Sequence, residues 1–180
     1  MKKIIFYLSI LPAIVISQIP NLLKDINTGG GSTRFSHFTS LSNSNILFGV
    51  MMGPSAGLWV SDGSIIGTRL LKAAAYPFSP FMDYQQKKYF VGTTPNSLLW
   101  RSDGTFTGTD SIPVMGLKTP TSFTVVNNLL FFIGSTNTSG AELWRTDGTV
   151  ASTFMLKDIW SNTGNGLTGS SSAYNPYLGV

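Results

Sequence analysis

The chain has 180 residues and a formal net charge of +4; 42% of its residues are hydrophobic and only 11% are charged. This apolar content excludes a disordered chain, and the length is sufficient for one hydrophobic core. The sequence contains no cysteine, which excludes disulfides and thiol catalysis. Abundant Gly, Ser, Thr and Asn, without an amphipathic helical pattern, predict many short strands joined by tight turns.

Residues 1–17 have the pattern of a secretory signal peptide. Lys2 and Lys3 precede an apolar run over residues 4–16, and a small residue stands just before Gln18, where cleavage is expected. The alternative is a membrane anchor, but this run is short for a bilayer span. Export predicts a secreted or outer-surface protein, with the periplasm as the alternative location. Loss of the two lysines lowers the formal charge from +4 to +2, and the scattered remaining Lys and Arg argue against nucleic-acid binding.

The rest of the chain contains a threefold internal repeat. The stretches LWVSDGSIIGT (58–68), LWRSDGTFTGT (99–109) and LWRTDGTVAST (143–153) share the pattern Leu-Trp-x-[Ser/Thr]-Asp-Gly. Upstream of each stretch, a Gly closes a short hydrophobic run, and a Phe stands eleven residues before that Gly. Such a period indicates a repeated structural unit, with these positions as fold determinants. The repeated positions are Phe38, Phe81, Phe123, Gly49, Gly92, Gly134, Trp59, Trp100, Trp144, Asp62, Gly63, Asp103, Gly104, Asp147 and Gly148.

Each unit is expected to contain four strands: one around the Phe, one ending at the Gly, one carrying Leu-Trp and one after the Asp-Gly loop. About 40–45 residues with four antiparallel strands is the size of a propeller blade. We therefore predict an all-β, propeller-like array of about three four-stranded blades with a partial unit at each end; an open β solenoid-like stack is the alternative. The predicted segments are a signal peptide (1–17), an N-terminal strand and linker (18–31), three repeats (32–75, 76–118 and 119–160), and a linker with the start of a truncated fourth repeat (161–180).

The repeat resembles the ELWxxDGT-repeat family, a hyalin-like or propeller-like group of secreted bacterial proteins. The resemblance covers residues 22–180 and includes the Leu-Lys-Asp-Ile segments at 23–26 and 156–159. Only Glu142 supplies the leading Glu, and Ser152 replaces the Gly that the other two units have. The resemblance implies a propeller-like fold and secretion, and no general activity. Three repeats are fewer than the ~4–8 blades of a closed ring, so the chain is expected to be a truncated member.

The Asp-Gly pairs allow two interpretations. Between two strands, Gly readily adopts a positive φ and Asp accepts hydrogen bonds from the backbone ahead of it, so the pair favours a tight turn. Alternatively, Asp62, Asp103 and Asp147 are candidate ligands for Ca²⁺. Calcium takes six to eight oxygen ligands, and each loop offers a single carboxylate. Turn formation is therefore favoured, and we predict no metal and no cofactor.

Candidate catalytic groups are few. Asp83, Asp110 and Glu142 are the carboxylates outside the repeated positions, and His37 is the sole histidine. A glycosidase requires two carboxylates that face each other across the scissile bond, and nothing in the sequence brings these three together. A lone histidine in a strand is more often a surface or partly packed residue than a catalytic one. We therefore predict no catalytic residue.

These observations favour an exported, non-catalytic β-repeat module that binds or scaffolds partners at the cell surface or outside the cell. The expected partner is a polysaccharide or a surface protein, without nucleic acid and without a membrane span after signal cleavage. Open sheet edges also predict self-association. Two alternatives remain open: a fragment of a secreted glycan-active propeller enzyme, and a truncated fragment with no independent function.

Overall fold

The computed structural model describes residues 22–26, 33–93, 98–161 and 163–167. All regular elements in this part of the chain are β-strands, and it contains no helix long and apolar enough to cross a membrane. The predicted signal peptide and most of the predicted fourth repeat lie outside the described residues.

Twelve strands form three separate four-stranded antiparallel sheets, each with its strands in sequence order. The first sheet contains β1 (Phe35–Ser40), β2 (Ile46–Val50), β3 (Gly57–Ser61) and β4 (Arg69–Ala73). The second sheet contains β5 (Met82–Tyr84), β6 (Lys87–Gly92), β7 (Leu98–Ser102) and β8 (Asp110–Ile112). The third sheet contains β9 (Lys118–Val126), β10 (Leu129–Thr136), β11 (Gly140–Thr146) and β12 (Phe154–Lys157).

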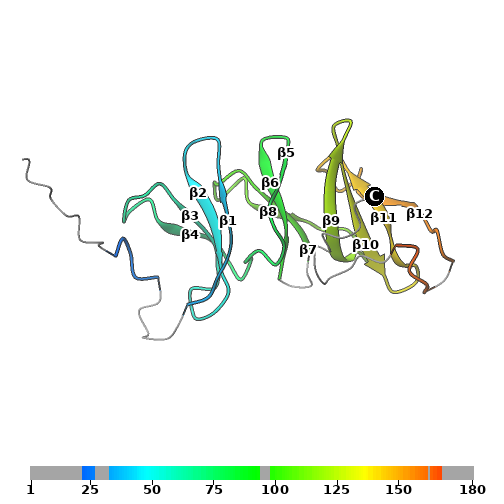
Figure 1. The fold of residues 1–180 in the computed structure, drawn as a ribbon, viewed down its shortest axis with the longest axis horizontal. Coiled ribbons are helices and arrows are strands. Elements are labelled where there is room, and N and C mark those ends of the chain that lie inside the picture. The colour runs from blue at the N-terminus through cyan, green and yellow to red at the C-terminus, as the bar shows by residue number, and fades with distance from the viewer. Residues whose placement is uncertain (1–21, 27–32, 94–97, 162, 168–180) are drawn as a thin grey trace, which may run out of the picture.

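The three sheets stand side by side along the long axis of the molecule (Figure 1). The predicted all-β class and the repeated four-stranded organisation are confirmed. Within the described residues the sheets form an open row, and none of them closes on itself.

Tight turns between the first two strands of a unit follow from local sequence. Asn127 and Asn128 join β9 to β10 with φ angles of 46° and 57°, and Gln85 and Gln86 join β5 to β6 with 47° and 61°. Two consecutive residues with positive φ make the type of two-residue turn whose twist matches antiparallel strands. Asn tolerates this conformation well, whereas Gln does so less readily.

The hydrophobic cores lie between neighbouring sheets. Leu47, Leu58 and Val60 of the first sheet pack in one cluster with Phe90 and Trp100 of the second sheet. This arrangement buries one face of the first sheet against the opposite face of the next.

The same arrangement recurs at the next junction. Tyr89, Leu99 and Ile112 of the second sheet form a cluster with Phe132 and Trp144 of the third sheet. Trp100 and Trp144 thus face the preceding sheet, while Leu58 and Leu99 face the following sheet, as the period-two alternation of a strand requires.

The strand pairing corrects the expected alignment of the three glycines. A Phe lies opposite each Trp, and the pairs are Phe48–Trp59, Phe90–Trp100 and Phe132–Trp144. Gly92 and Gly134 lie two residues after their Phe, whereas Gly49 follows its Phe directly, so the alignment is wrong by one residue in the first unit. The cause is the first turn: residues 41–45 join β1 to β2, against two residues in each other sheet.

Gly92 and Gly134 are needed because a Trp ring packs across the neighbouring strand. A Cβ at Gly92 would overlap Cδ1 of Trp100, and one at Gly134 would overlap Cδ1 of Leu117 and lie 3.0 Å from Cδ1 of Trp144. Gly49 has a different role, since a Cβ there would run into the side chains of Ser36 and Pro77.

Candidate functional site

The Asp-Gly loops carry a repeated hydrogen-bond network. In the second unit, Oδ1 of Asp103 accepts hydrogen bonds from the backbone N–H (2.8 Å) and the hydroxyl (2.7 Å) of Thr105. Oγ of Ser102 accepts one from the N–H of Gly104 (3.0 Å) and lies 2.7 Å from Oγ1 of Thr109. The loop is therefore closed both at its tip and across its base.

The first and third units repeat this network. The hydroxyl oxygens at the base are 2.6 Å apart in Ser61–Thr68 and in Thr146–Thr153, and both pairs are buried. The Asp carboxylates again accept from the backbone two residues ahead, at 2.8 and 2.9 Å. The loop glycines Gly63, Gly104 and Gly148 have φ of 86°, 87° and 96°, which favours glycine.

The threonine at the base of each loop (Thr68, Thr109 and Thr153) was not identified from the sequence. Its signal is a Ser or Thr followed seven residues later by a Thr, a spacing that all three units contain. The Asp-Gly loops are hydrogen-bonded turns in which the Asp, the Gly and both hydroxyl residues hold the backbone.

Hydrogen bonds within the loops also set the charge of the Asp side chains. The side chain and then the backbone of Ser64 lower the pKa of Asp62, and those of Thr149 lower the pKa of Asp147. Burial raises the pKa of Asp103, but the hydrogen bonds from Thr105 and the charge of Lys87 outweigh it, so that pKa is also below its ordinary value. The three carboxylates are ionised at neutral pH.

These three carboxylates belong to three different sheets. Among the described residues, no group of three or more His, Asp or Glu side chains is arranged to hold a metal ion. The candidate calcium ligands Asp62, Asp103 and Asp147 each bind donors of their own loop.

Two of the carboxylates outside the repeat form ion pairs. Asp83 lies 2.5 Å from Nζ of Lys88. Asp110 receives two hydrogen bonds from Arg101, at 2.8 and 2.9 Å, and this contact raises the pKa of the guanidinium. Arg101 also donates to the carbonyl oxygen of Gly148 (2.6 Å), so it links the second sheet to the Asp-Gly loop of the third.

The third of these carboxylates, Glu142, organises the segment that follows β12. Its side chain is buried and accepts hydrogen bonds from the N–H groups of Ile159 (3.0 Å) and Gly166 (2.9 Å), with a longer one from Trp160 (3.5 Å). Burial raises the pKa of Glu142, but the three backbone donors together lower it below its ordinary value. The leading Glu of the third unit is therefore an anchor for the backbone of Ile159, Trp160 and Gly166.

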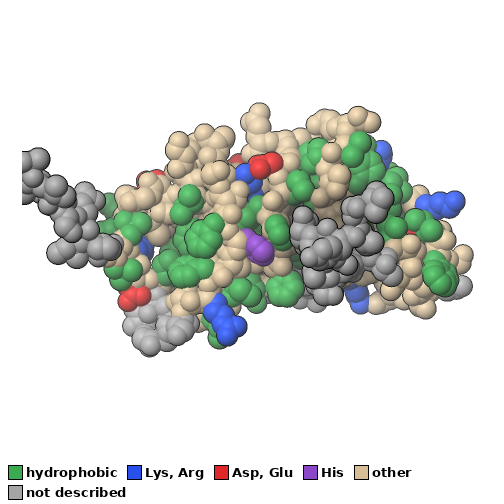
Figure 2. Space-filling view, in the orientation of Figure 1, with side chains coloured by type: hydrophobic (Ala, Val, Ile, Leu, Met, Phe, Trp, Pro, Cys, Tyr) green, Lys and Arg blue, Asp and Glu red, His purple; other side chains and the backbone are tan. Residues whose placement is uncertain are grey.

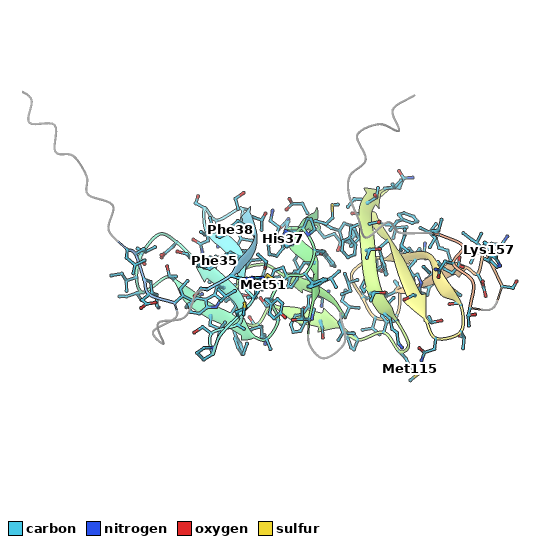
Figure 3. The ribbon with its side chains drawn as sticks, turned by 60° about the horizontal axis from the view of Figure 1, so that its bottom comes forward. Phe35, His37, Phe38, Met51, Met115 and Lys157 are labelled. Carbon is cyan, nitrogen blue, oxygen red and sulfur yellow. The ribbon has the colours of Figure 1, made fainter. Side chains whose placement is uncertain are left out.

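The single histidine lies on the surface. His37 is exposed on β1, and Figures 2 and 3 show it on the outside of the molecule. The structure gives it an unusual φ of 23°, next to the irregular pairing between Ser36 and Phe38.

A row of three aromatic rings crosses each sheet. In the first sheet the ring centroids of Phe38 and Phe48 are 5.4 Å apart, and those of Phe48 and Trp59 are 6.4 Å apart. Equivalent rows have spacings of 5.3 and 6.4 Å in the second sheet and 5.9 and 6.2 Å in the third. The repeated Phe and Trp positions therefore form one structural feature. The other two rows are Phe81–Phe90–Trp100 and Phe123–Phe132–Trp144.

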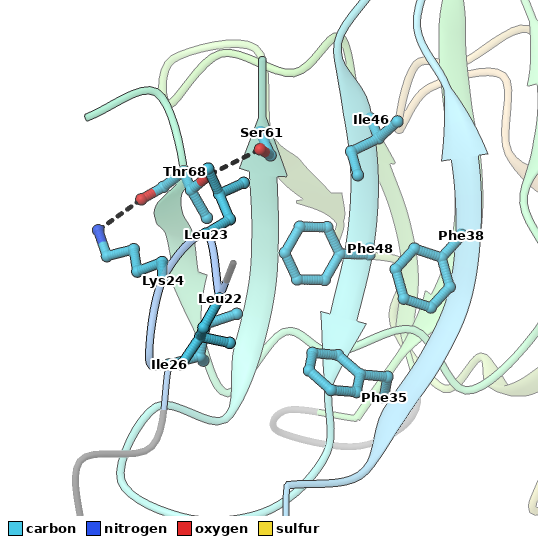
Figure 4. A pocket seen from close by; sticks show the side chains of 10 residues that line it. All are labelled: Leu22, Leu23, Lys24, Ile26, Phe35, Phe38, Ile46, Phe48, Ser61 and Thr68. Atoms are coloured by element: carbon cyan, nitrogen blue, oxygen red, sulfur yellow. Dashed lines mark hydrogen bonds between the residues drawn. The ribbon is translucent and has the colours of Figure 1, made fainter. Parts of the chain in front are cut away.

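The row on the first sheet differs from the other two because no sheet precedes it among the described residues. Phe38 is 61% exposed and the neighbouring Phe35 is 48% exposed, and hydrophobic side chains gather over this sheet in Figure 2. The short segment 22–26 lies against the row and leaves an apolar pocket of about 210 Å³ (Figure 4). Its Lys24 donates a hydrogen bond to the carbonyl oxygen of Thr68 (2.6 Å).

The fold and these contacts define an all-β protein made of repeated four-stranded antiparallel sheets. Comparison of the chain with family models, with curated proteins and with solved structures finds no match. The features from which a function can be inferred are therefore the open aromatic row, the pocket beside it and the internally bonded loops.

Proposed function

We propose that this protein is an exported, non-catalytic β-repeat module that binds or scaffolds partners at the cell surface or outside the cell. One observation carries the proposal. The aromatic rows of the second and third sheets pack against a neighbouring sheet, whereas in the row of the first sheet Phe48 and Trp59 are buried but Phe38 is 61% exposed. An exposed apolar patch with a buried counterpart elsewhere in the same chain is typical of an interaction surface.

The engagement of the carboxylates supports a non-catalytic role. Asp83 and Asp110 form ion pairs with a lysine and an arginine side chain, and Glu142 accepts hydrogen bonds from backbone N–H groups. A catalytic acid or base needs a pKa matched to its proton transfer, but the pKa of Glu142 is lowered by structural hydrogen bonds.

The chemistry of the open row favours a protein partner over a polysaccharide. The pocket is lined mainly by apolar side chains, among them Leu22, Ile26, Phe35 and Phe48. Sugar hydroxyls buried there would lose hydrogen bonds to water with few polar groups to replace them. Apolar side chains of a protein partner match this lining.

The larger arrangement that we propose is a propeller-like array, with an open stack as the alternative. Support comes from the repeated junctions between sheets and from segment 22–26, which matches the sequence of a last strand and lies beside the first sheet. The resemblance to ELWxxDGT-repeat proteins supports the same fold and the extracellular location.

Binding and catalysis are separated by one experiment. The purified protein is applied to a glycan panel and to isolated outer-surface proteins, with binding and product release both measured. We expect saturable binding to a protein without product release, weakened at least about tenfold in Phe38→Ser, which loses roughly one buried ring. Met115→Ser is the matched control, because Met115 is 99% exposed in a turn. Release of a glycan product contradicts the proposal.

Export is tested separately by mass spectrometry of the protein made in its own cells. We expect a mature chain that begins at Gln18 in the medium or at the outer surface. An intact chain that begins at Met1 inside the cell contradicts export.

A further inference from the structure

The two junctions between sheets follow a common pattern that extends beyond the aromatic rows. The glycines of the second and third Asp-Gly loops touch the preceding unit. A Cβ at Gly104 would overlap Leu41 of the first sheet, and one at Gly148 would lie 2.5 Å from the hydroxyl of Tyr89 in the second. A Cβ at Gly63 would meet no atom within 4 Å, because the first sheet has no such neighbour in the described part of the chain. Sheet 1 therefore presents an unfilled junction.

Segment 22–26 occupies one strand position of that junction. Lys72, which ends the Leu-Leu-Lys of β4, places its Nζ 3.9 Å from the centroid of the Phe106 ring in the next Asp-Gly loop. Lys24, which ends the same Leu-Leu-Lys in the N-terminal segment, donates to the carbonyl oxygens of Ile65 (3.4 Å) and Thr68 (2.6 Å). Ile65 and Phe106 both lie three residues after the loop Asp. Both lysines thus reach an Asp-Gly loop of the sheet that follows them, although Leu23 is 43% exposed where its counterpart Leu71 is 3% exposed.

Segment 22–26 fills only part of the junction. It is one short segment without strand pairing, whereas a complete neighbouring sheet supplies four strands, and Phe35, Phe38 and Ile46 remain 48%, 61% and 43% exposed. Phe48 itself is 4% exposed, close to its counterparts Phe90 at 0% and Phe132 at 1%, so the exposed part of the first row is the side that β1 forms.

The outer face of the third sheet has the side chains that such a junction requires. Lys72 is paired with Leu58, and Lys157 is paired with Leu143, so Leu156 corresponds to Leu71. Leu71 is 3% exposed against the second sheet, whereas Leu156 is 42% exposed.

Leu143 and Phe131 are the counterparts of Leu58 and Leu47, which are fully buried at the first junction, and both are only partly buried. Lys157 and Phe38 lie toward opposite ends of the row of sheets (Figure 3). Among the described residues, an open junction face therefore lies at each end of the row of sheets, and the apolar side chains of the two faces correspond.

The two ends also share a sequence. Leu156-Lys157-Asp158-Ile159 is identical to Leu23-Lys24-Asp25-Ile26. A segment with the same four residues can make the same contacts with the first sheet, including the lysine hydrogen bonds to the Asp-Gly loop.

We infer that a second copy of this chain docks head to tail, with the outer face of its third sheet on the aromatic row of the first sheet. Its residues 156–159 replace residues 23–26, and its Lys157 donates to the carbonyl oxygens of Ile65 and Thr68. This inference rests on the proposed scaffolding role and identifies one partner for it. The docked sheet covers Phe35 and Phe38, which the intrachain segment leaves exposed.

Head-to-tail docking uses two different surfaces, so each copy retains one free face of each kind until a ring closes. Such heterologous contacts generate rings or open filaments rather than symmetric dimers. We therefore expect species larger than a dimer as concentration rises.

Sedimentation velocity of the purified full-length chain across a wide concentration range tests the inference. We expect concentration-dependent assembly in the wild type. Phe38→Asp should block one face and Leu156→Asp the other, each raising the concentration needed for half-assembly at least about tenfold. Met115→Asp is the control and should assemble as the wild type does.

Mixing provides the sharpest result. Phe38→Asp keeps an intact third sheet and Leu156→Asp keeps an intact first sheet, so an equimolar mixture should form a dimer and stop there. Failure of the mixture to dimerise, or a wild type that stays monomeric at all concentrations, overturns the inference. If circular dichroism shows that Leu156→Asp is misfolded, Lys157→Glu replaces it, because that exposed side chain carries the new hydrogen bonds.

The replacement step has its own test. Lys24→Ala weakens the hold of the intrachain segment 22–26 on the first sheet. The third sheet of a second copy should then replace this segment more easily, so the variant should assemble at a lower concentration than the wild type. Unchanged or weaker assembly of Lys24→Ala overturns the exchange of residues 23–26. If assembly fails while the wild type still binds a surface protein in the panel, only this inference falls and the proposed function stands.

Discussion

Ser102 and Thr109 share a buried hydrogen bond of 2.7 Å between their hydroxyl oxygens, and Thr109 donates in turn to the carbonyl oxygen of Thr105 (2.5 Å). Thr109→Val keeps the side-chain shape and removes both bonds. The variant leaves a buried hydroxyl and a carbonyl without their partner, so we expect a loss of about 1–3 kcal/mol in the free energy of unfolding, measured by urea titration.

Thr107→Val in the same loop is the control, because Thr107 is exposed. A surface substitution away from such bonds changes stability by less than about 0.5 kcal/mol. Equal effects of the two variants would show that the buried hydroxyl pair does not close the loop.

Trp144 is expected to be a major determinant of stability. It is 5% exposed, and its ring stacks on Phe132 with centroids 6.2 Å apart in the core between the second and third sheets. Trp144→Ala should cost about 3–5 kcal/mol, the range for removal of a buried aromatic side chain. Trp160→Ala is the control, because Trp160 is 65% exposed, and its unfolding midpoint in urea should stay close to that of the wild type. A similar drop for both variants contradicts the role of the row.

The repeated signals in the sequence were sufficient to predict the strands and their grouping. Leu-Trp, the upstream hydrophobic run and the Asp-Gly pair mark the third strand, the second strand and the turn that follows, because alternation and turn chemistry are local properties. β6 (Lys87–Gly92) ends at its repeated Gly as expected, whereas β5 (Met82–Tyr84) begins one residue after Phe81 instead of surrounding it.

Register and exposure could not be predicted in the same way. Gly49 differs from Gly92 because a longer turn precedes β2, and turn length fixes which residues pair. The exposure of Phe38 depends on whether another sheet lies in front of it, which is a property of the assembled row and not of the repeat. Glu142 was identified as a departure from the motif, but its bonds to residues 159–166 depend on the path of a segment without a periodic pattern.

Gly63 and Gly104 form a matched pair that separates backbone strain from packing between sheets. Their φ angles are 86° and 87°, so alanine is strained equally at both positions. A Cβ at Gly104 also overlaps Leu41, whereas at Gly63 it meets nothing within 4 Å. We expect Gly104→Ala to destabilise the protein by about 1–3 kcal/mol more than Gly63→Ala, because overpacking adds to the strain. Equal losses in urea unfolding would show that the second Asp-Gly loop does not pack on the first sheet.

The Asp-Gly loops should make the protein sensitive to acid. Hydrogen bonds from the side chain and backbone of Thr149 lower the pKa of Asp147 below its ordinary value of 3.8. A carboxyl with a lower pKa in the folded state binds fewer protons there, so it stabilises the fold above the unfolded pKa and loses this effect as pH falls through the folded pKa. Stability should therefore stay level from about pH 7 to 5 and fall below about pH 4, as thermal melts at each pH can show.

Asp147→Asn isolates one carboxylate of this effect. The amide oxygen can still accept the hydrogen bonds from Thr149 but does not titrate in this range. The variant should be less stable at pH 7, and its free energy of unfolding should fall less steeply as the pH is lowered. The difference in slope from the wild type should correspond to at most one proton. An unchanged slope between pH 5 and 3 would show that Asp147 contributes nothing to acid sensitivity.

Glu142 should hold the backbone of Ile159 and Gly166 in place. Its carboxylate accepts from the N–H groups of Ile159 and Gly166, and a Cβ at Gly166 would overlap the same carboxylate. Glu142→Gln replaces one accepting oxygen by an NH₂ group that faces donors, so these bonds weaken even though the side chain keeps its size. Amide hydrogen exchange should become at least about tenfold faster at Ile159 and Gly166 and remain unchanged at Phe90, in the core between the first two sheets. Equal acceleration at Phe90 would mean that Glu142 supports the whole fold and not the segment after β12. Unchanged exchange at Ile159 would mean that the segment is held by contacts other than this carboxylate.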